Sequence, residues 1–128
     1  MSQLRSTAEH ESAHAVAARH FGVRVHEISI NPRTMAGRTD CDRTSLQKTA
    51  VILAAGDVWC RHLSQLPYLD RACSDLRRFE RDHGLSQLWH AEREARRILT
   101  LHQRAVLALS DRLMRETRIV LDPRRQAA

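Results

Sequence analysis

Two histidines and a glutamate near the N-terminus form the pattern with the clearest chemistry in this 128-residue sequence. His10 and His14 are four residues apart, so on a helix both imidazoles lie on one face, at a separation that suits a tetrahedral zinc ion. Glu11 lies about 100° around the helix from His10, where it reaches a zinc-bound water without ligating the ion. The pattern therefore predicts a zinc site at which Glu11 is the catalytic base for hydrolysis of a peptide bond.

A catalytic zinc ion needs a third protein ligand, and Asp75 is the favoured one. It falls within or beside the apolar arc of a predicted helix, where a carboxylate is costly unless it is paired or binds a metal. His83 shares the same face and is an alternative ligand or a partner of a ligand. The choice between these two side chains stays open at this point.

Two other side chains compete for the same role. His20 is six residues after His14, which matches a longer histidine motif of zinc proteases, but Ala17 stands where that motif has glycine. Because alanine favours continuation of the helix, we expect His20 to be carried away from the metal. Glu27, on the segment that follows, would be an unusual ligand so close behind the helix, and we expect an exposed strand residue there.

The elements that must position these residues begin with a helix. Ser6 to Glu9 reads as a capping box that starts it, small apolar residues suit a central position, and Phe21-Gly22 ends it. Val23 to Ile30 is rich in β-branched residues and predicts a strand, with Met35 to Thr39 as a return strand. A small hairpin or sheet should therefore follow the first helix.

The remaining segments predict further helices. Thr44 to Gln47 is a second capping box, opening a helix that ends before Pro67. Its predicted apolar side is made of Leu46, Ala50, Val51, Leu53 and Ala54. A third helix is predicted over 71–83 and closed by Gly84, and a long amphipathic helix with room for one break over 86–118. That last helix should bury a stripe of Ala95, Ile98, His102, Ala105, Val106, Leu109 and Leu113. Residues from about 119 to 128 are predicted to be a C-terminal tail.

The charge balance is basic, with 21 Lys and Arg against 15 Asp and Glu and a formal net charge of +6. The arginines alternate with acidic residues at helical spacing, as on a solvated helix face, and the few aromatic residues are scattered. A nucleic-acid partner is therefore not favoured. No apolar run is long enough to cross a membrane, and the three cysteines have no CxxC spacing, which predicts a cytoplasmic protein with reduced thiols.

Taken in order, these segments resemble the peptidase domain of the FtsH-type ATP-dependent zinc metalloproteases. The matching stretches are Ala8 to Val16, Val25 to Pro32 with Gly37 after it, Leu53 to Gly56, Cys73 to Leu76, and the closing helix Glu94 to Arg118 with Leu121-Asp122. The resemblance implies His10, His14 and Asp75 as ligands of a Zn²⁺ ion and Glu11 as the catalytic base. It also implies a single FtsH-like domain over 1–128, mainly α, with a zincin-like helical metallopeptidase fold.

The function expected from these observations is that of a zinc metalloendopeptidase acting on protein or peptide substrates. The sequence has no phosphate-binding G-x-x-x-x-G-K-[ST] motif, so we expect it to cleave flexible or unfolded segments, or to depend on a separate ATPase or adaptor. Extended peptides should pair with a strand edge at Val25 to Ile30. The alternatives are a non-enzymatic FtsH-like domain that binds metal or a protein partner, and a basic helical module that binds nucleic acid. The oligomeric state is left open.

Overall fold

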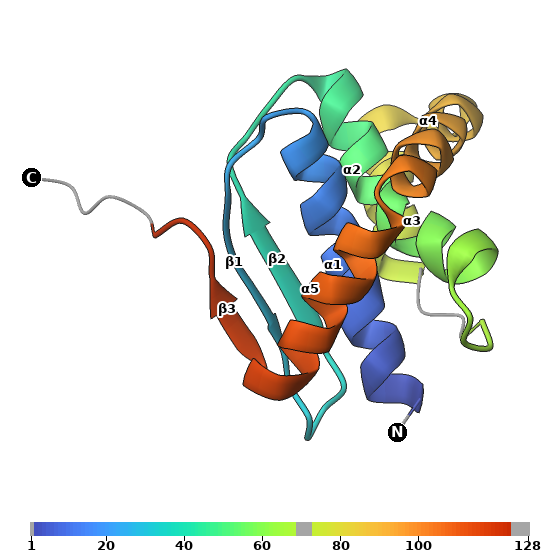
Figure 1. Ribbon diagram of the computed structural model, residues 1–128. Coiled ribbons are helices and arrows are strands. Elements are labelled where there is room, and N and C mark those ends of the chain that lie inside the picture. The colour runs from blue at the N-terminus through green and yellow to red at the C-terminus, as the bar shows by residue number, and fades with distance from the viewer. Residues whose placement is uncertain (1, 69–72, 124–128) are drawn as a thin grey trace, which may run out of the picture.

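The computed structural model describes residues 2–68 and 73–123, which form a mainly helical fold with one small sheet (Figure 1). The elements in chain order are α1 (Ser2–His20), β1 (Val25–Ile30), β2 (Gly37–Cys41), α2 (Leu46–Val58), a π-helical turn (Trp59–Leu63), α3 (Cys73–His83), a 3-10 turn (Leu85–Gln87), α4 (Leu88–Leu101), α5 (Gln103–Glu116) and β3 (Arg118–Val120). A mainly helical fold with a small sheet after the first helix was predicted, and this is confirmed.

Helix α1 lies at the centre of the fold, with the sheet on one side and α2 on the other (Figure 1). Five of its alanines have no exposed surface: Ala8, Ala13, Ala15, Ala17 and Ala18. Because these side chains are small, neighbouring elements can approach the α1 backbone closely from several directions. The predicted end of the helix is confirmed by Gly22, which has a φ of 72°, the left-handed conformation that closes a helix.

The predicted start of α1 is wrong. The helix begins at Ser2, so Ser6 and Glu9 lie inside it and form no capping box. The Glu9 carboxylate instead accepts hydrogen bonds from Trp59 Nε1 and Ser64 Oγ, both at 2.7 Å, and forms an ion pair with Arg5. These long-range partners stabilise a buried charge and attach the π-helical turn to α1.

The sheet has the order β2-β1-β3, and both pairs of strands are antiparallel. Because β1 is paired on both sides, the prediction that Val25 to Ile30 offers an edge to substrates is wrong; β2 is the edge strand on the side of the predicted site. Part of the predicted tail also belongs to the sheet. Ile119 is 1% exposed and pairs with Ile28, so burial of this side chain holds the C-terminal residues in β3.

Helix α2 begins one residue later than its predicted capping box. Ser45 is the N-cap, and its hydroxyl accepts a hydrogen bond from the backbone N–H of Lys48. As a result Leu46 lies in the first turn and is 72% exposed, although it was predicted on the apolar side. The other four residues predicted there, from Ala50 to Ala54, are buried as expected.

The C-terminal half of the described chain consists of three helices. Helix α3 ends at His83 as predicted, followed by Gly84 with a φ of 79°. The predicted long helix is broken at His102 into α4 and α5. Ala105 was predicted in the buried stripe but is exposed, because the buried face of α5 is centred on Val106, Ser110 and Leu113 and Ala105 lies beside it.

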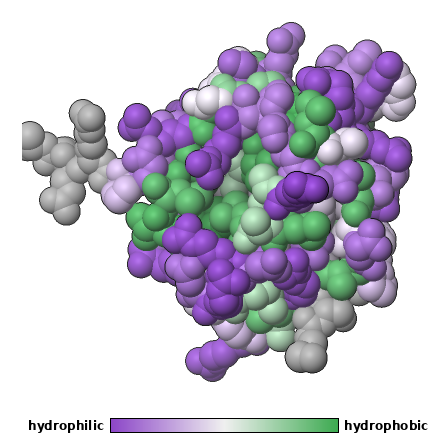
Figure 2. All heavy atoms as spheres, in the orientation of Figure 1, coloured by the Kyte–Doolittle hydropathy of each residue, from purple (hydrophilic) through white to green (hydrophobic). Residues whose placement is uncertain are grey.

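The face of the molecule drawn in Figure 2 is mostly polar. Figure 2 shows apolar side chains gathered between β3 and α5 on the face turned toward the viewer, with polar side chains over most of the remainder. No helix in the described ranges is both long and apolar enough to cross a membrane.

The buried and the exposed face of α4 should contribute differently to stability. Substitution of one leucine on each face tests this. Leu99 has no exposed surface and Leu101 is 65% exposed. We expect Leu99→Ala to lower the free energy of unfolding by about 2–5 kcal/mol, because it leaves a cavity, and Leu101→Ala to change it by less than about 0.5 kcal/mol. Urea denaturation followed by circular dichroism measures both; equal effects would contradict the core described here.

Candidate metal centre

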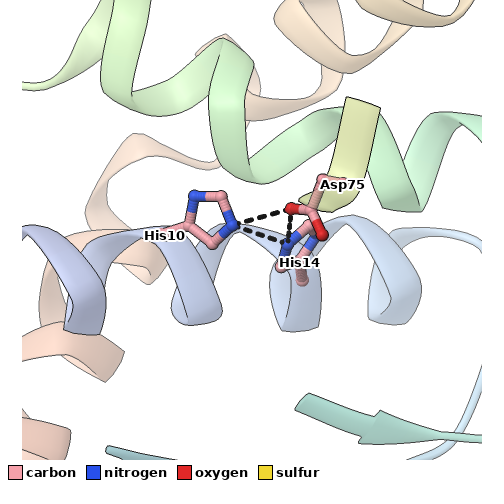
Figure 3. Close-up of side chains that lie close together, drawn as sticks. All are labelled: His10, His14 and Asp75. Carbon is pink, nitrogen blue, oxygen red and sulfur yellow. Dashed lines mark hydrogen bonds and ion pairs between the residues drawn. The ribbon is translucent and has the colours of Figure 1, made fainter. Parts of the chain in front are cut away.

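The two motif histidines lie side by side on the face of α1 that is turned toward α3 (Figure 3). Their Nε2 atoms are 3.1 Å apart, and their ring planes are nearly perpendicular, at 85°. This is the arrangement expected for residues four apart on a helix. Both side chains are largely buried, with 13% of His10 and 10% of His14 exposed.

Asp75 joins the histidines from a distant part of the sequence. It lies in the first turn of α3, and its Oδ2 is 2.9 Å from His10 Nε2 and 3.2 Å from His14 Nε2 (Figure 3). A carboxylate in this position is favoured by the positive end of the helix dipole. The structure therefore brings together the three side chains that the sequence predicts as ligands, and they are the one group of three such side chains found in the described residues.

The three donor atoms form a triangle with sides of 2.9, 3.1 and 3.2 Å. A zinc ion with bonds of about 2.0–2.2 Å and angles between 90° and the tetrahedral value holds its ligands roughly 2.9–3.5 Å apart. The triangle fits this range without movement of any helix. Two imidazoles and one carboxylate are also a donor set that zinc prefers.

The hydrogen bonding of His14 prepares it to bind a metal. Its Nδ1 is 2.7 Å from the backbone carbonyl oxygen of Ile52 on α2, a distance at which Nδ1–H donates to the carbonyl. With that proton on Nδ1, the lone pair of a neutral ring is on Nε2, the atom that points to Asp75. Such a contact fixes both the tautomer and the orientation of a ligating histidine.

The site attracts positive charge. Burial by itself would lower the pKa of His14, but the hydrogen bond to Asp75 and the charges of Glu11 and Asp75 outweigh it and raise the pKa to about 9. Burial would likewise raise the pKa of Asp75, and the hydrogen bonds from His10 and His14 instead hold it well below its usual range. Asp75 is thus an ionised carboxylate, the form that binds a metal.

Glu11 lies beside the triad but is held by the sheet. Its carboxylate is buried and accepts a hydrogen bond from Thr39 Oγ1 on β2 at 2.7 Å. It lines two neighbouring cavities, one shared with His10 and Asp75 and the other with His14 and Asp75. Glu11 therefore borders the space around the triad without taking part in it, as the motif predicts.

Two glycines allow other elements to approach the site closely. A Cβ at Gly56 on α2 would be 2.6 Å from His10 Nε2 and 2.7 Å from His14 Nε2. A Cβ at Gly37 on β2 would be 2.6 Å from Cγ of Glu11. Sequence reasoning used both glycines only in the family resemblance, and it missed the role of Thr39, because no local spacing links them to the motif.

The three competing ligands lie elsewhere. His20 is next to His102, with Nδ1 and Nε2 3.0 Å apart. The ring of His83 packs on Phe79, and its Nε2 makes no hydrogen bond within the described residues. Glu27 was predicted to be exposed but is half-buried, and it pairs with Arg118 of β3.

Compared with known proteins, the sequence matches no family model and no curated protein. The interpretation of this site therefore rests on its own geometry and chemistry.

The close approach at Gly56 leads to a prediction. In an ordinary helix interior, Gly→Ala stabilises by roughly 1 kcal/mol. Here the added methyl group would push the imidazoles apart, so we expect Gly56→Ala to weaken Zn²⁺ binding by about 10- to 100-fold while the protein stays folded. Isothermal titration calorimetry measures the affinity, and circular dichroism checks the fold.

Ala54→Gly on the same helix is the matched control. It weakens the helix by about 1 kcal/mol without adding an atom beside the histidines, so Zn²⁺ affinity should not change. Unchanged affinity in Gly56→Ala would mean that the metal does not bind at this triad.

Proposed function

We propose that this protein is a zinc-dependent endopeptidase that hydrolyses peptide bonds in flexible or unfolded protein segments. One observation carries the proposal: Asp75, more than 60 residues away in sequence, completes a triangle of donors with His10 and His14 beside the buried carboxylate of Glu11. A chance pair of surface histidines would not be expected to have a half-buried carboxylate at ligand distance, with a backbone acceptor on the far nitrogen of one ring.

His10, His14 and Asp75 would hold the zinc ion, which supplies Lewis acidity for hydrolysis when bound. Glu11 then has the task of moving a proton. It accepts the proton of the attacking water and transfers it to the nitrogen of the leaving amine. The hydroxyl of Thr39 keeps the carboxylate turned toward the site by its hydrogen bond to Oε1.

The edge strand β2 supports an extended mode of substrate binding. Among the described strands it pairs with β1 alone, so its outer edge is available, and it carries both Gly37 and Thr39, which contact Glu11. A substrate that adds to β2 as a further strand would run past the triad with its backbone held by hydrogen bonds. Since only an extended chain can do this, flexible segments are the proposed substrates, and a separate ATPase or adaptor could supply them from folded proteins.

Replacement of the proposed base tests the enzyme assignment. We expect Glu11→Gln to bind one equivalent of Zn²⁺ like the unmodified protein but to cleave casein about 10²- to 10⁴-fold more slowly, because an amide cannot accept the proton. Metal analysis and a fluorescent casein assay measure the two properties. Equal cleavage by both proteins would show a contaminating protease, and absence of bound zinc in the unmodified protein would contradict the proposal.

The third ligand has its own pair of variants. Asp75→Asn should lower Zn²⁺ affinity markedly and abolish cleavage, whereas His20→Ala should leave cleavage unchanged. The opposite result would favour His20 as the ligand. A protein that binds zinc at the triad and cleaves nothing would instead be a non-enzymatic metal-binding domain.

Thr39 is proposed to position Glu11. We expect Thr39→Val to lower kcat about 10- to 100-fold, the effect of a lost hydrogen bond to a charged group, with Zn²⁺ affinity unchanged. Thr49→Val is the matched control. Thr49 lines the same cavity as Thr39 and His14, but its hydroxyl donates to the backbone carbonyl of Ser45 and not to Glu11, so kcat should not change. Steady-state kinetics with a peptide substrate distinguish the two variants.

A further inference from the structure

A second pair of histidines lies outside the proposed zinc site. His20 is the last residue of α1, and His102 is the residue at which α4 ends and α5 begins. They are 82 residues apart in sequence, yet their Nδ1 and Nε2 atoms are 3.0 Å from each other. Their ring centroids are 5.2 Å apart, with an angle of 64° between the ring planes.

The distance between the two nitrogens is short enough for them to share a proton, and it also suits two bonds to one metal ion. A divalent transition metal with bonds of about 2.0–2.1 Å and angles of 90° to 109° holds two imidazole nitrogens roughly 2.8–3.4 Å apart. The observed distance falls within this range. One nitrogen comes from Nδ1 and the other from Nε2, and both positions are normal metal donors of neutral histidine.

We propose that His20 and His102 form a second metal site, which binds a divalent transition ion such as Ni²⁺ or Zn²⁺ through two imidazoles, with water at the remaining positions. The metal takes the place of the proton that the two rings share. The pair is exposed enough for an ion to enter from solvent, since His20 lies on the surface and His102 is half-buried.

Two features near the pair contribute negative potential. His20 is in the last turn of α1, at the negative end of the helix dipole. Glu94 on α4 is also close: its pKa is lowered mainly by the hydrogen bond from Arg97 and, to a smaller extent, by the charges of Arg97 and His20. Because the Glu94 carboxylate is also paired with Arg97, it compensates only part of the charge of a bound cation.

A bound ion would connect the end of α1 to the junction of α4 and α5. The two rings already link these segments, through one hydrogen bond and an edge-to-face ring contact. Two metal–nitrogen bonds are stronger than this single hydrogen bond, so the metal should make the protein more resistant to unfolding.

The test is a titration of the metal-free full chain with Ni²⁺ by isothermal titration calorimetry. The unmodified protein should bind one more equivalent than His20→Ala and one more than His102→Ala. His90→Ala is the matched control, because His90 is exposed on α4 and its ring contact is with Trp89, so this variant should bind as many ions as the unmodified protein. Circular dichroism checks that all four proteins are folded.

The number of ions bound by the Asp75→Asn variant distinguishes this second site from the proposed zinc site of the endopeptidase. In the Asp75→Asn background, one equivalent should still bind, and addition of His20→Ala should remove it. Ni²⁺ should also raise the Tm of the unmodified protein more than that of His102→Ala. If His20→Ala and His102→Ala bind as many ions as the unmodified protein, the second site does not exist, whatever the outcome at the triad.

Discussion

The structure depends on the burial of a helix that carries charged and polar side chains. Helix α1 is covered by the sheet on one side and by α2 on the other. Six of its polar side chains are at most 9% exposed: Ser6, Thr7, Glu9, Glu11, Ser12 and His14. A buried charge is tolerated only when it has close partners. The neighbouring elements must therefore supply specific donors and acceptors to α1 as well as apolar surface, and this requirement sets where they lie.

Glu9 and Glu11 show how partners determine the part that a carboxylate plays. The two residues are close together on one helix and have similar burial. Glu9 has an ion pair on one oxygen and two side-chain hydrogen bonds on the other, and it joins α1 to the π-helical turn. Glu11 has a single side-chain hydrogen bond to one oxygen and borders two cavities. The proposed function therefore assigns proton transfer to Glu11 and a structural role to Glu9.

The surroundings of Glu9 and Glu11 also show how much of the site could be predicted from the sequence. The spacing of His10, Glu11 and His14 predicts their placement, because it depends only on the geometry of a single helix. Asp75 could be predicted from the cost of a carboxylate on an apolar stripe. The capping box at Ser6 was wrong because a Ser-x-x-Glu pattern gives no information about Trp59 and Ser64, which are the actual partners of Glu9. For the same reason the third strand was missed: Arg118 to Val120 form a strand only because β1 offers them an edge.

The charges around the triad are consistent with the proposal that it binds a divalent ion. Asp75 and Glu11 place two carboxylates around the buried ring of His14. Among the described hydrogen bonds and ion pairs of the triad, none comes from a lysine or an arginine. The raised pKa of His14 is the response of the site to this excess negative charge, since a proton on the ring compensates part of it. A proton supplies one positive charge, whereas a divalent metal supplies two and needs no imidazolium. Asp75 and Glu11 raise the pKa of His14 by their negative charge. The same charge would favour replacement of that proton by Zn²⁺.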